Sequence, residues 1–429
     1  MGTNFALQPL NALIAARPST QEPMWLQALR ATAHAHFNAA GLPGKRWESW
    51  HYSAADIWLQ QFNEQHGLAP VALGADAPAA FPSDNQLHFS HGHLSSKKLD
   101  APITLLPLQH LDAEKHAALI NWLGDYPHKD SLASLATALA SESWVLIIPA
   151  NAQIEQPICV SHHTTQPGAQ IAQLIVWVEV GAKATLLETF SGDDSHAALQ
   201  IAHTQVQVGG NAKLTYARLN RDAQNSQHLG VFEADLQRDA QLRVQVLRGG
   251  DNVADANQKQ RNGLYIRLQE NGAEFIARGA FAAAGAQHID YHLTVEHNAD
   301  HGRCDMQVQG IAGGKSRGVV NGRIYIAKKT RDNDGHFTSH NLLLSNDAEI
   351  DAKPELEIHA DEVRCNHGAT VGQFDEDQLL YLATRGIDRA EAIALLTEGF
   401  LKAGLLETGT IALDEFLQQQ LLASIGGGA

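Results

Sequence analysis

The sequence predicts a mainly β protein, in which a parallel β-helix of stacked coils lies between an N-terminal and a C-terminal helical region. Three observations support this fold class. Between residues 143 and 372 the hydrophobic residues alternate with period two, and no helix-sized pattern interrupts them. Nearly every run of alternation ends in a small-residue turn such as Gly181-Ala182 or Gly272-Ala273. On both sides of this region the hydrophobic period changes to that of helices.

An internal repeat favours a solenoid over other all-β folds. Turn alanines recur at intervals of roughly 30 residues, with the last interval counted as two repeat units, at Ala182, Ala212, Ala240, Ala273, Ala299 and Ala348. Repeats of this length that are made of short strands suit coils that stack on one another. A β-sandwich is the main alternative, but its turn signals normally come every 8–12 residues or so, without a longer repeat.

The N-terminal region, residues 1–142, is predicted to be mostly helical. A helical pattern covers about 25–62 and is broken at the Gly41-Leu42-Pro43-Gly44 turn. Further helices are expected at 112–123 and 131–140, with short extended segments at 87–90 and 103–106.

The C-terminal region, residues 373–429, is predicted to hold three helices. Two of them begin at residues with capping-box spacing and end at glycines (Asp375 with Gln378, Asp388 with Glu391, then Gly386 and Gly404). A third is expected at 413–425. From the pattern alone, this region is equally well explained as a docking surface for a partner or as a cap on the open end of the solenoid.

Bulk properties exclude several classes of function. The formal net charge is −16 and no stripe of Lys and Arg is present, which argues against nucleic-acid binding. The longest apolar runs are strand-sized, so no membrane span is expected. The first residues lack a secretory pattern, and three widely spaced cysteines (Cys159, Cys304, Cys365) suit a reducing compartment, so a cytoplasmic location is predicted. Most of the 23 histidines stand in polar surroundings and are expected at the surface.

Several motifs suggest chemistry but are better explained by structure. The run Gly310 to Ser316 is one residue short of a phosphate-binding loop and is followed by a strand pattern instead of a helix. His297, His301 and Cys304 are zinc-ligand types, but their spacing suits a helix and the segment has the pattern of strand and turn. Cys159 lies in an apolar strand, where a buried thiol is expected.

An acidic cluster raises the possibility of a carbohydrate-active enzyme, since β-helix lyases and hydrolases gather carboxylates in one groove. Glu355, Glu357, Asp361 and Glu362 are the tight acidic group of the repeat region. Strand alternation favours a solvated edge for them, and the secretion signal usual in such enzymes is not seen. This enzyme class is kept as the alternative function.

Cys365 and His367 are the strongest candidates for metal ligands. Residues i and i+2 of an extended segment point the same way, roughly 6–7 Å apart. A thiolate and an imidazole so placed suit one soft metal. Iron–sulfur clusters and structural zinc usually take four protein ligands, so the missing ligands would have to come from elsewhere.

Four parts of the sequence resemble one known family. Residues 360–372 together with 375–377 and 381–387 resemble the signature of the SufB/SufD family of iron–sulfur cluster assembly scaffolds, and 314–324 and 341–358 match other stretches of it. Residues 41–43 with 48–52 resemble the entry motif of the family's N-terminal helical domain. The short N-terminal region and the Cys-x-His near the end are similar to the SufD branch.

The resemblance implies a right-handed parallel β-helix and a scaffold without catalytic activity of its own. It implies a complex with a SufB-like paralogue and a SufC-like ABC-type ATPase, and family members also form homodimers. The C-terminal helices would contact the ATPase, with Leu379, Tyr381, Leu382 and Arg385 as the partner-binding residues. His367 would help a cysteine of the paralogue to hold a transient iron–sulfur cluster, with Cys365 beside it, and the isolated chain would carry no cofactor. A purely structural partner whose Cys and His never touch metal is a third hypothesis.

Overall fold

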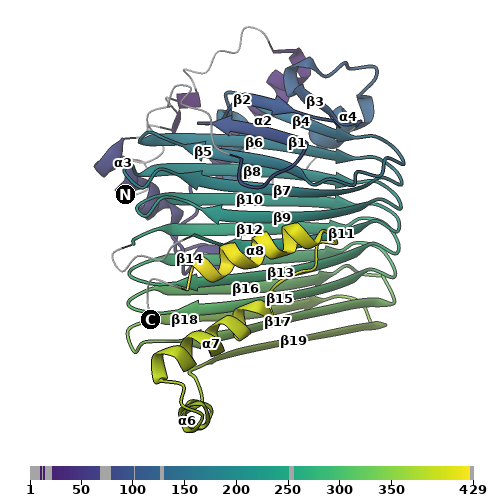
Figure 1. Cartoon of the computed structure of the whole chain (residues 1–429). Helices are drawn as coiled ribbons and strands as arrows, with labels where there is room; N and C mark the ends of the chain where they lie inside the picture. Colours follow the sequence, from purple (N-terminus) through teal and green to yellow (C-terminus); the bar gives the residue numbers. More distant parts are fainter. Residues whose placement is uncertain are drawn as a thin grey trace.

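A parallel β-solenoid of about eight turns dominates the protein (Figure 1). The structure is a computed structural model that describes residues 10–11, 13–14, 22–67, 79–100, 102–125, 130–250 and 256–425. Two sheets form the solenoid. In spatial order, the ten-stranded sheet contains β19 (Val363–Gly372), β17 (Asn333–Leu343), β15 (Arg303–Ala312), β13 (Glu274–Ala283), β11 (Gln241–Arg248), β9 (Lys213–Arg221), β7 (Lys183–Gly192), β5 (Ile158–Thr164), β1 (Asn85–Ser90) and β2 (His93–Lys98). The nine-stranded sheet contains β18 (Glu349–Ile358), β16 (Arg317–Ile326), β14 (His288–His297), β12 (Lys259–Leu268), β10 (Gln227–Leu236), β8 (Ala198–Val208), β6 (Gly168–Val178), β4 (Ser143–Ile148) and β3 (Thr104–Pro107).

The pairing confirms the solenoid and rules out the sandwich. From β4 onward each strand pairs in parallel with the strand two positions later, so each coil gives one strand to each sheet. Parallel neighbours cannot be joined by the tight hairpins of a sandwich. The N-terminal end differs, because β1 pairs with β2 and β3 with β4 in the antiparallel sense. The sheets therefore begin ahead of residue 143.

Left-handed residues stack at one corner of the solenoid and set its repeat. Positive φ angles occur at Asn151, Gly181, Asn211, Asp239, Gly272, His301 and Asp332. Each of these residues donates its backbone N–H to a carbonyl of the next coil, as Gly181 does to Gly210 at 3.0 Å and Asp332 to Glu362 at 2.8 Å. Glycine takes this conformation at no steric cost, and Asn and Asp tolerate it better than most residues.

The alanine repeat is correct for four positions and wrong for two. Ala182, Ala212, Ala240 and Ala273 directly precede residues that pair in register, so these alanines stack in one column beside the left-handed corner. The next members of the column are Gly302 and Asn333. Ala299 lies in the turn three residues earlier, and Ala348 precedes β18 in the other sheet.

The space between the sheets is apolar along one side and polar along the other. Leu186, Val206 and Phe232 belong to one continuous hydrophobic cluster that runs through the coils. On the polar side, Glu188 of β7 and Arg218 of β9 are also buried, with side chains 1% and 0% exposed. Several histidines expected at the surface are buried too, namely His88, His91, His162, His203, His228, His292 and His297.

The N-terminal helices cover the outside of the nine-stranded sheet. They are α2 (Met24–Ala40), α3 (Ala55–His66), α4 (Ala117–Asp125) and α5 (Ser131–Leu139), with short 3-10 turns at Glu48–Trp50 and Leu108–His110. The predicted break at Gly41 is confirmed, since its φ of 76° ends α2. Asp130 caps α5 and also accepts a hydrogen bond from Tyr265 of the sheet at 2.9 Å, which ties the helix to the solenoid.

The C-terminal helices are α6 (Glu376–Thr384), α7 (Arg389–Lys402) and α8 (Ile411–Ala423), as the capping signals predicted. Asp375 and Asp388 cap α6 and α7 through backbone N–H groups, and Gly386 follows α6 with a φ of 85°. Helices α7 and α8 lie on the outer face of the ten-stranded sheet, whereas α6 extends beyond the last coil (Figure 1). Within the described residues, none of the helices has the length and apolar character that crossing a bilayer requires.

Candidate functional site

The two candidate ligands lie on β19, at the end of the solenoid. This strand is one edge of its sheet, and β18, from the same last coil, is the edge of the other. No described strand lies beyond them (Figure 1). An edge strand leaves a row of backbone donors and acceptors free to pair with another chain. The site is therefore placed where a second protein could complete it.

Cys365 faces the interior of the last coil. It pairs in register with Gly335 and packs, half-buried, against the end of the hydrophobic core. Gly335 lies directly beside it, because a Cβ at that glycine would be in van der Waals contact with the Cys365 sulfur at 3.4 Å. Burial raises the pKa of the thiol, so at neutral pH Cys365 is protonated until a metal or another cation favours the thiolate.

His367 lies on the same face of β19, in register with Phe337 of β17. The i, i+2 spacing thus places imidazole and thiol on one side of the strand, as predicted. Unlike Cys365, His367 is exposed to solvent. Its neighbour in the preceding coil, Phe337, is 1% exposed, so an apolar ring lies beside the imidazole.

The opposite face of the same strands carries a separate polar ladder. His336 donates a hydrogen bond from Nδ1 to the amide oxygen of Asn366 at 2.7 Å, and its Nε2 lies 2.7 Å from the carboxylate of Asp334. The hydrogen bond with Asn366 and the charge of Asp334 raise the pKa of His336. His340 contacts Thr370 at 3.2 Å. The pairs with Asn366 and Thr370 join β17 to β19 on this face. Cys365 and His367 point to the other face and take no part in these hydrogen bonds.

The arrangement offers one sulfur and one nitrogen ligand from a single strand. Among the described residues, no group of three His, Cys, Asp or Glu side chains is positioned to hold a metal ion. A cluster held here would need ligands from a second chain.

The predicted partner-binding residues lie on and beside α6. Tyr381 is 58% exposed and Leu380 is 64% exposed, while Leu379 is buried. The guanidinium of Arg385 lies 5.2 Å from the centre of the Tyr381 ring and donates to its hydroxyl at 3.1 Å. Beside the helix, a groove of about 520 Å³ is lined by residues of β17, α6 and α7, including Leu343, Phe374, Leu379 and Ile393.

Among the described residues, the other cysteines and histidines do not form a second metal site. His297 and Cys304 do approach each other, with Nε2 3.3 Å from the sulfur, but both are fully buried. Burial lowers the pKa of His297 and raises that of Cys304, which keeps both neutral. His301 lies apart in the exposed turn. Cys159 is buried as expected, and burial raises its pKa to about 12.

The remaining motifs are structural, as the sequence suggested. Residues 310–316 form the end of β15 and a turn at Gly314 before β16, with no helix to face a phosphate. Glu355 and Glu357 lie on the outer face of β18, where they pair with Asn321 and Arg323 of β16. Hydrogen bonds from His359 and Arg323 lower the pKa of Glu357, which is the wrong direction for a general acid at neutral pH.

Comparison with known proteins agrees with this geometry. Residues 160–400 match the family model described as "SUF system FeS cluster assembly, SufBD core domain". This chain belongs to the SufBD family. A SufBD family iron–sulfur cluster assembly protein of Synechocystis is 27% identical over 90% of this chain and 85% of its own length. The iron–sulfur cluster assembly protein SufD of Escherichia coli is 34% identical over 58% of this chain and 57% of its own length. A SufD of Bacillus subtilis is 25% identical over 63% and 61%.

The match to the SufBD core covers the candidate site and both α6 and α7. Gly335 and Phe337 lie in register with the two candidates Cys365 and His367, but the sequence analysis did not single them out. The repeat could have identified them, because Gly335 and Phe337 precede Cys365 and His367 by 30 positions each, which is close to one repeat of the solenoid.

Proposed function

We propose that this SufBD family member is a non-catalytic scaffold subunit, of the SufD type, in the SUF system of iron–sulfur cluster assembly. Its last coil pairs with a SufB-like paralogue, and a transient cluster, which is cargo and not a resident cofactor, is held between the two chains. His367 and Cys365 supply the ligands from this side. A SufC-like ATPase binds at α6, and the complex works in the cytoplasm.

The observation that carries the proposal is the position of the incomplete ligand pair. His367 is exposed on the edge strand of the last coil, and Cys365 lies half-buried beside it. Paired edge strands would bring the residues of two chains within reach of one cluster. Exposed apolar side chains at this edge, Ile358 at 39% and Val371 at 44%, support burial against another chain.

The docking of the ATPase at α6 is supported by the exposed Leu380 and Tyr381, next to a groove whose lining includes Phe374 and Ile393. Aromatic residues that stand on a rigid element are typical anchors of protein interfaces. The remaining helices α7 and α8 bury their apolar residues against the solenoid and offer fewer such groups.

A His367→Ala variant tests the ligand role. In a complex co-expressed with the paralogue and the ATPase, we expect the iron and sulfide content to fall several-fold, because one ligand of the cluster is lost. Complex formation, measured by size-exclusion chromatography, should persist because His367 makes no described contact that holds the fold. His110→Ala, at an exposed histidine of the 3-10 turn Leu108–His110 far from β19, is the matched control and should leave cluster content unchanged. An intact complex with full cluster content would disprove the ligand role.

A Tyr381→Ala variant tests the α6 surface. We expect binding to the ATPase to weaken by about tenfold, as for an aromatic anchor worth more than about 1 kcal/mol. The melting temperature should hardly change, because the ring is 58% exposed. Ile411→Ala on α8, 77% exposed in the free chain, is the control and should bind normally. Equal affinity of the two variants, measured by isothermal titration calorimetry, would place the ATPase elsewhere.

A further inference from the structure

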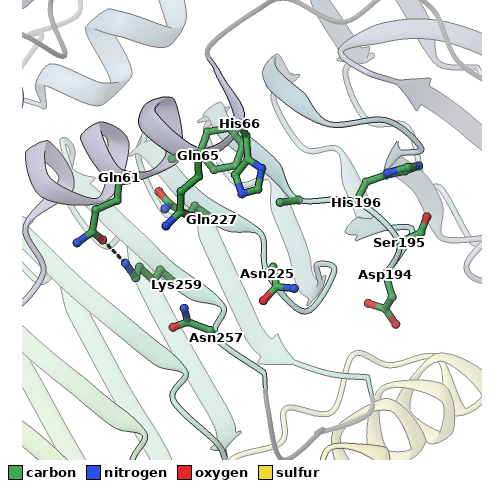
Figure 2. Close-up of a pocket in the computed structure, with 12 residues that line it drawn as sticks. Gln61, Gln65, His66, Asp194, Ser195, His196, Asn225, Gln227, Asn257 and Lys259 are labelled. Carbon is green, nitrogen blue, oxygen red and sulfur yellow. Dashed lines mark hydrogen bonds between the residues drawn. The ribbon is translucent and has the colours of Figure 1, made fainter.

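A second cavity lies far from β19, against the middle coils of the solenoid. It encloses about 630 Å³ between α3 and the turns that lead into β8, β10 and β12 (Figure 2). Gln61, Gln65 and His66 of α3 form one wall, and the turns form the other. The volume falls in the range of roughly 300–1,000 Å³ that is usual for small-molecule sites.

The lining is dominated by neutral hydrogen-bonding groups. Amide side chains come from three different segments, and His66, His196 and Ser195 add further polar atoms; the amides are Gln61, Gln65, Asn225, Gln227 and Asn257. Such groups can both donate and accept hydrogen bonds. The lining therefore suits a ligand with several hydroxyl or amine groups.

Lys259 brings a positive charge that no carboxylate among the described residues balances. Its Nζ donates to the amide oxygen of Gln61 at 2.6 Å, a neutral acceptor. No carboxylate of the described residues lies within ion-pair distance of it, and burial lowers its pKa with no opposing charge. A half-buried ammonium gains most from an anionic partner.

The amide oxygen of Gln227 is a second polar group of the cavity that lacks a partner among the described residues. The Gln227 side chain is 6% exposed, and its Oε1 is buried without a hydrogen-bond partner in the described structure. A buried acceptor that lacks a donor costs roughly 1–3 kcal/mol, so such atoms normally bind a ligand or water. The residue lies in the wall of the same cavity as Lys259.

We propose that this cavity binds a small hydroxylated organic anion, whose carboxylate or phosphate pairs with Lys259 while a hydroxyl group donates to Gln227. Asp194 lies at the opposite rim, exposed, and accepts from the backbone N–H of Gln224 at 3.1 Å. Its charge disfavours ligands with several negative groups and favours a single one. Because the ligand would touch both α3 and the solenoid turns, it would also hold that helix against the coils.

Four probes separate the parts of this proposal when binding to the purified chain is measured by calorimetry and thermal shift. Gluconate carries a carboxylate and hydroxyls, ribose 5-phosphate a phosphate and hydroxyls, inorganic phosphate the anion alone, and ribose the hydroxyls alone. We expect gluconate or ribose 5-phosphate to bind and to raise the melting temperature, with inorganic phosphate weaker and ribose weakest. Whichever of the first two binds more tightly identifies the anionic group.

The variants Lys259→Met and Gln227→Leu test the two contacts. Lys259→Met should weaken the better probe by about tenfold or more, since a charge-assisted hydrogen bond is lost. Gln227→Leu should weaken it by several-fold while leaving inorganic phosphate unaffected. Lys213→Met, at an exposed lysine that begins β9, is the matched control and should bind normally. The proposal is overturned if no probe binds at millimolar concentration, if Lys259→Met binds as tightly as Lys213→Met, or if inorganic phosphate alone binds as tightly as the organic anions.

Discussion

A Glu188→Ala variant is expected to lose about 3–5 kcal/mol of its free energy of unfolding, because it leaves a buried arginine without its counter-charge. The Glu188 carboxylate accepts hydrogen bonds from Thr204 at 2.8 Å, from Arg218 at 3.1 Å and from the hydroxyl of Tyr216. The Nε2 atom of His162 lies 3.1 Å away. All of these side chains are buried inside the solenoid, so no solvent replaces the lost carboxylate.

Two further variants separate the charge from the volume. Glu188→Gln keeps the size of the side chain and should still be clearly destabilised, since Arg218 remains unpaired. The double variant Glu188→Leu with Arg218→Met removes both charges and should recover much of the loss, as apolar replacements of buried pairs often do. Urea unfolding followed by circular dichroism measures all three. A loss below about 1 kcal/mol for Glu188→Ala would show that the network is not a major source of stability.

The same carboxylate gives a pH signature. Burial alone raises the pKa of Glu188, but the hydrogen bond with His162 and the charge of Arg218 outweigh it and hold the pKa far below the usual 4.5. A lowered pKa in the folded state means that the stabilisation is complete above about pH 4.5 and is lost as the pH falls toward the folded pKa. Urea midpoints of the wild type should therefore decline below that pH, and Glu188→Gln should lack this share of the decline.

A Val371→Lys variant is expected to abolish or greatly weaken pairing of this chain with the SufB-like paralogue. Val371 is 44% exposed on the edge strand β19, and a lysine at such a position blocks the approach of another strand. If the residue is central to the interface, the loss should exceed about 2 kcal/mol, or roughly 30-fold in affinity. Pull-down and analytical ultracentrifugation of the co-expressed chains measure it.

The control for this experiment is Val180→Lys. Val180 is 54% exposed in a turn between β6 and β7, far along the solenoid from β19, so pairing should be unaffected. Both variants should keep the melting temperature of the isolated chain. Normal assembly by Val371→Lys would mean that the paralogue binds another surface.

Much of the solenoid could be predicted because its physics is local. Alternation identified the long strands, and the alanines of the turns gave the repeat. The antiparallel pairs at the start, such as β1 with β2, were not foreseen, since strands of six residues show too little of any period. The predicted alanine repeat was wrong at the next two positions of the column, which are occupied by Gly302 and Asn333. There the amide of Asn333 accepts a hydrogen bond from the Gly302 backbone at 2.8 Å and closes the corner by a different contact.

The polar interior was the larger omission. Leu186, Glu188 and Phe190 are alternate residues of one strand, so their side chains point to the same, inner face. A lone glutamate is nevertheless normally expected in solvent. Only the pairing of β7 with β9 shows that Arg218 lies directly opposite Glu188 and compensates its charge. The pair Cys365 and His367 was easier to find, because its geometry depends on one strand alone. In the proposed function the remaining ligands come from another chain, which a single sequence does not contain.

The one-sided packing of the last coil has a consequence for motion. In a solenoid each coil touches only its neighbours, so stability is close to a sum of nearest-neighbour terms. The coil of β18 and β19 has one such neighbour, whereas every coil in the middle has two. Its backbone amides should therefore open and exchange with solvent ahead of those in the central coils. The strand that bears His367 is thus the one that an arriving partner would order, so binding and the final folding of this edge would be a single coupled event.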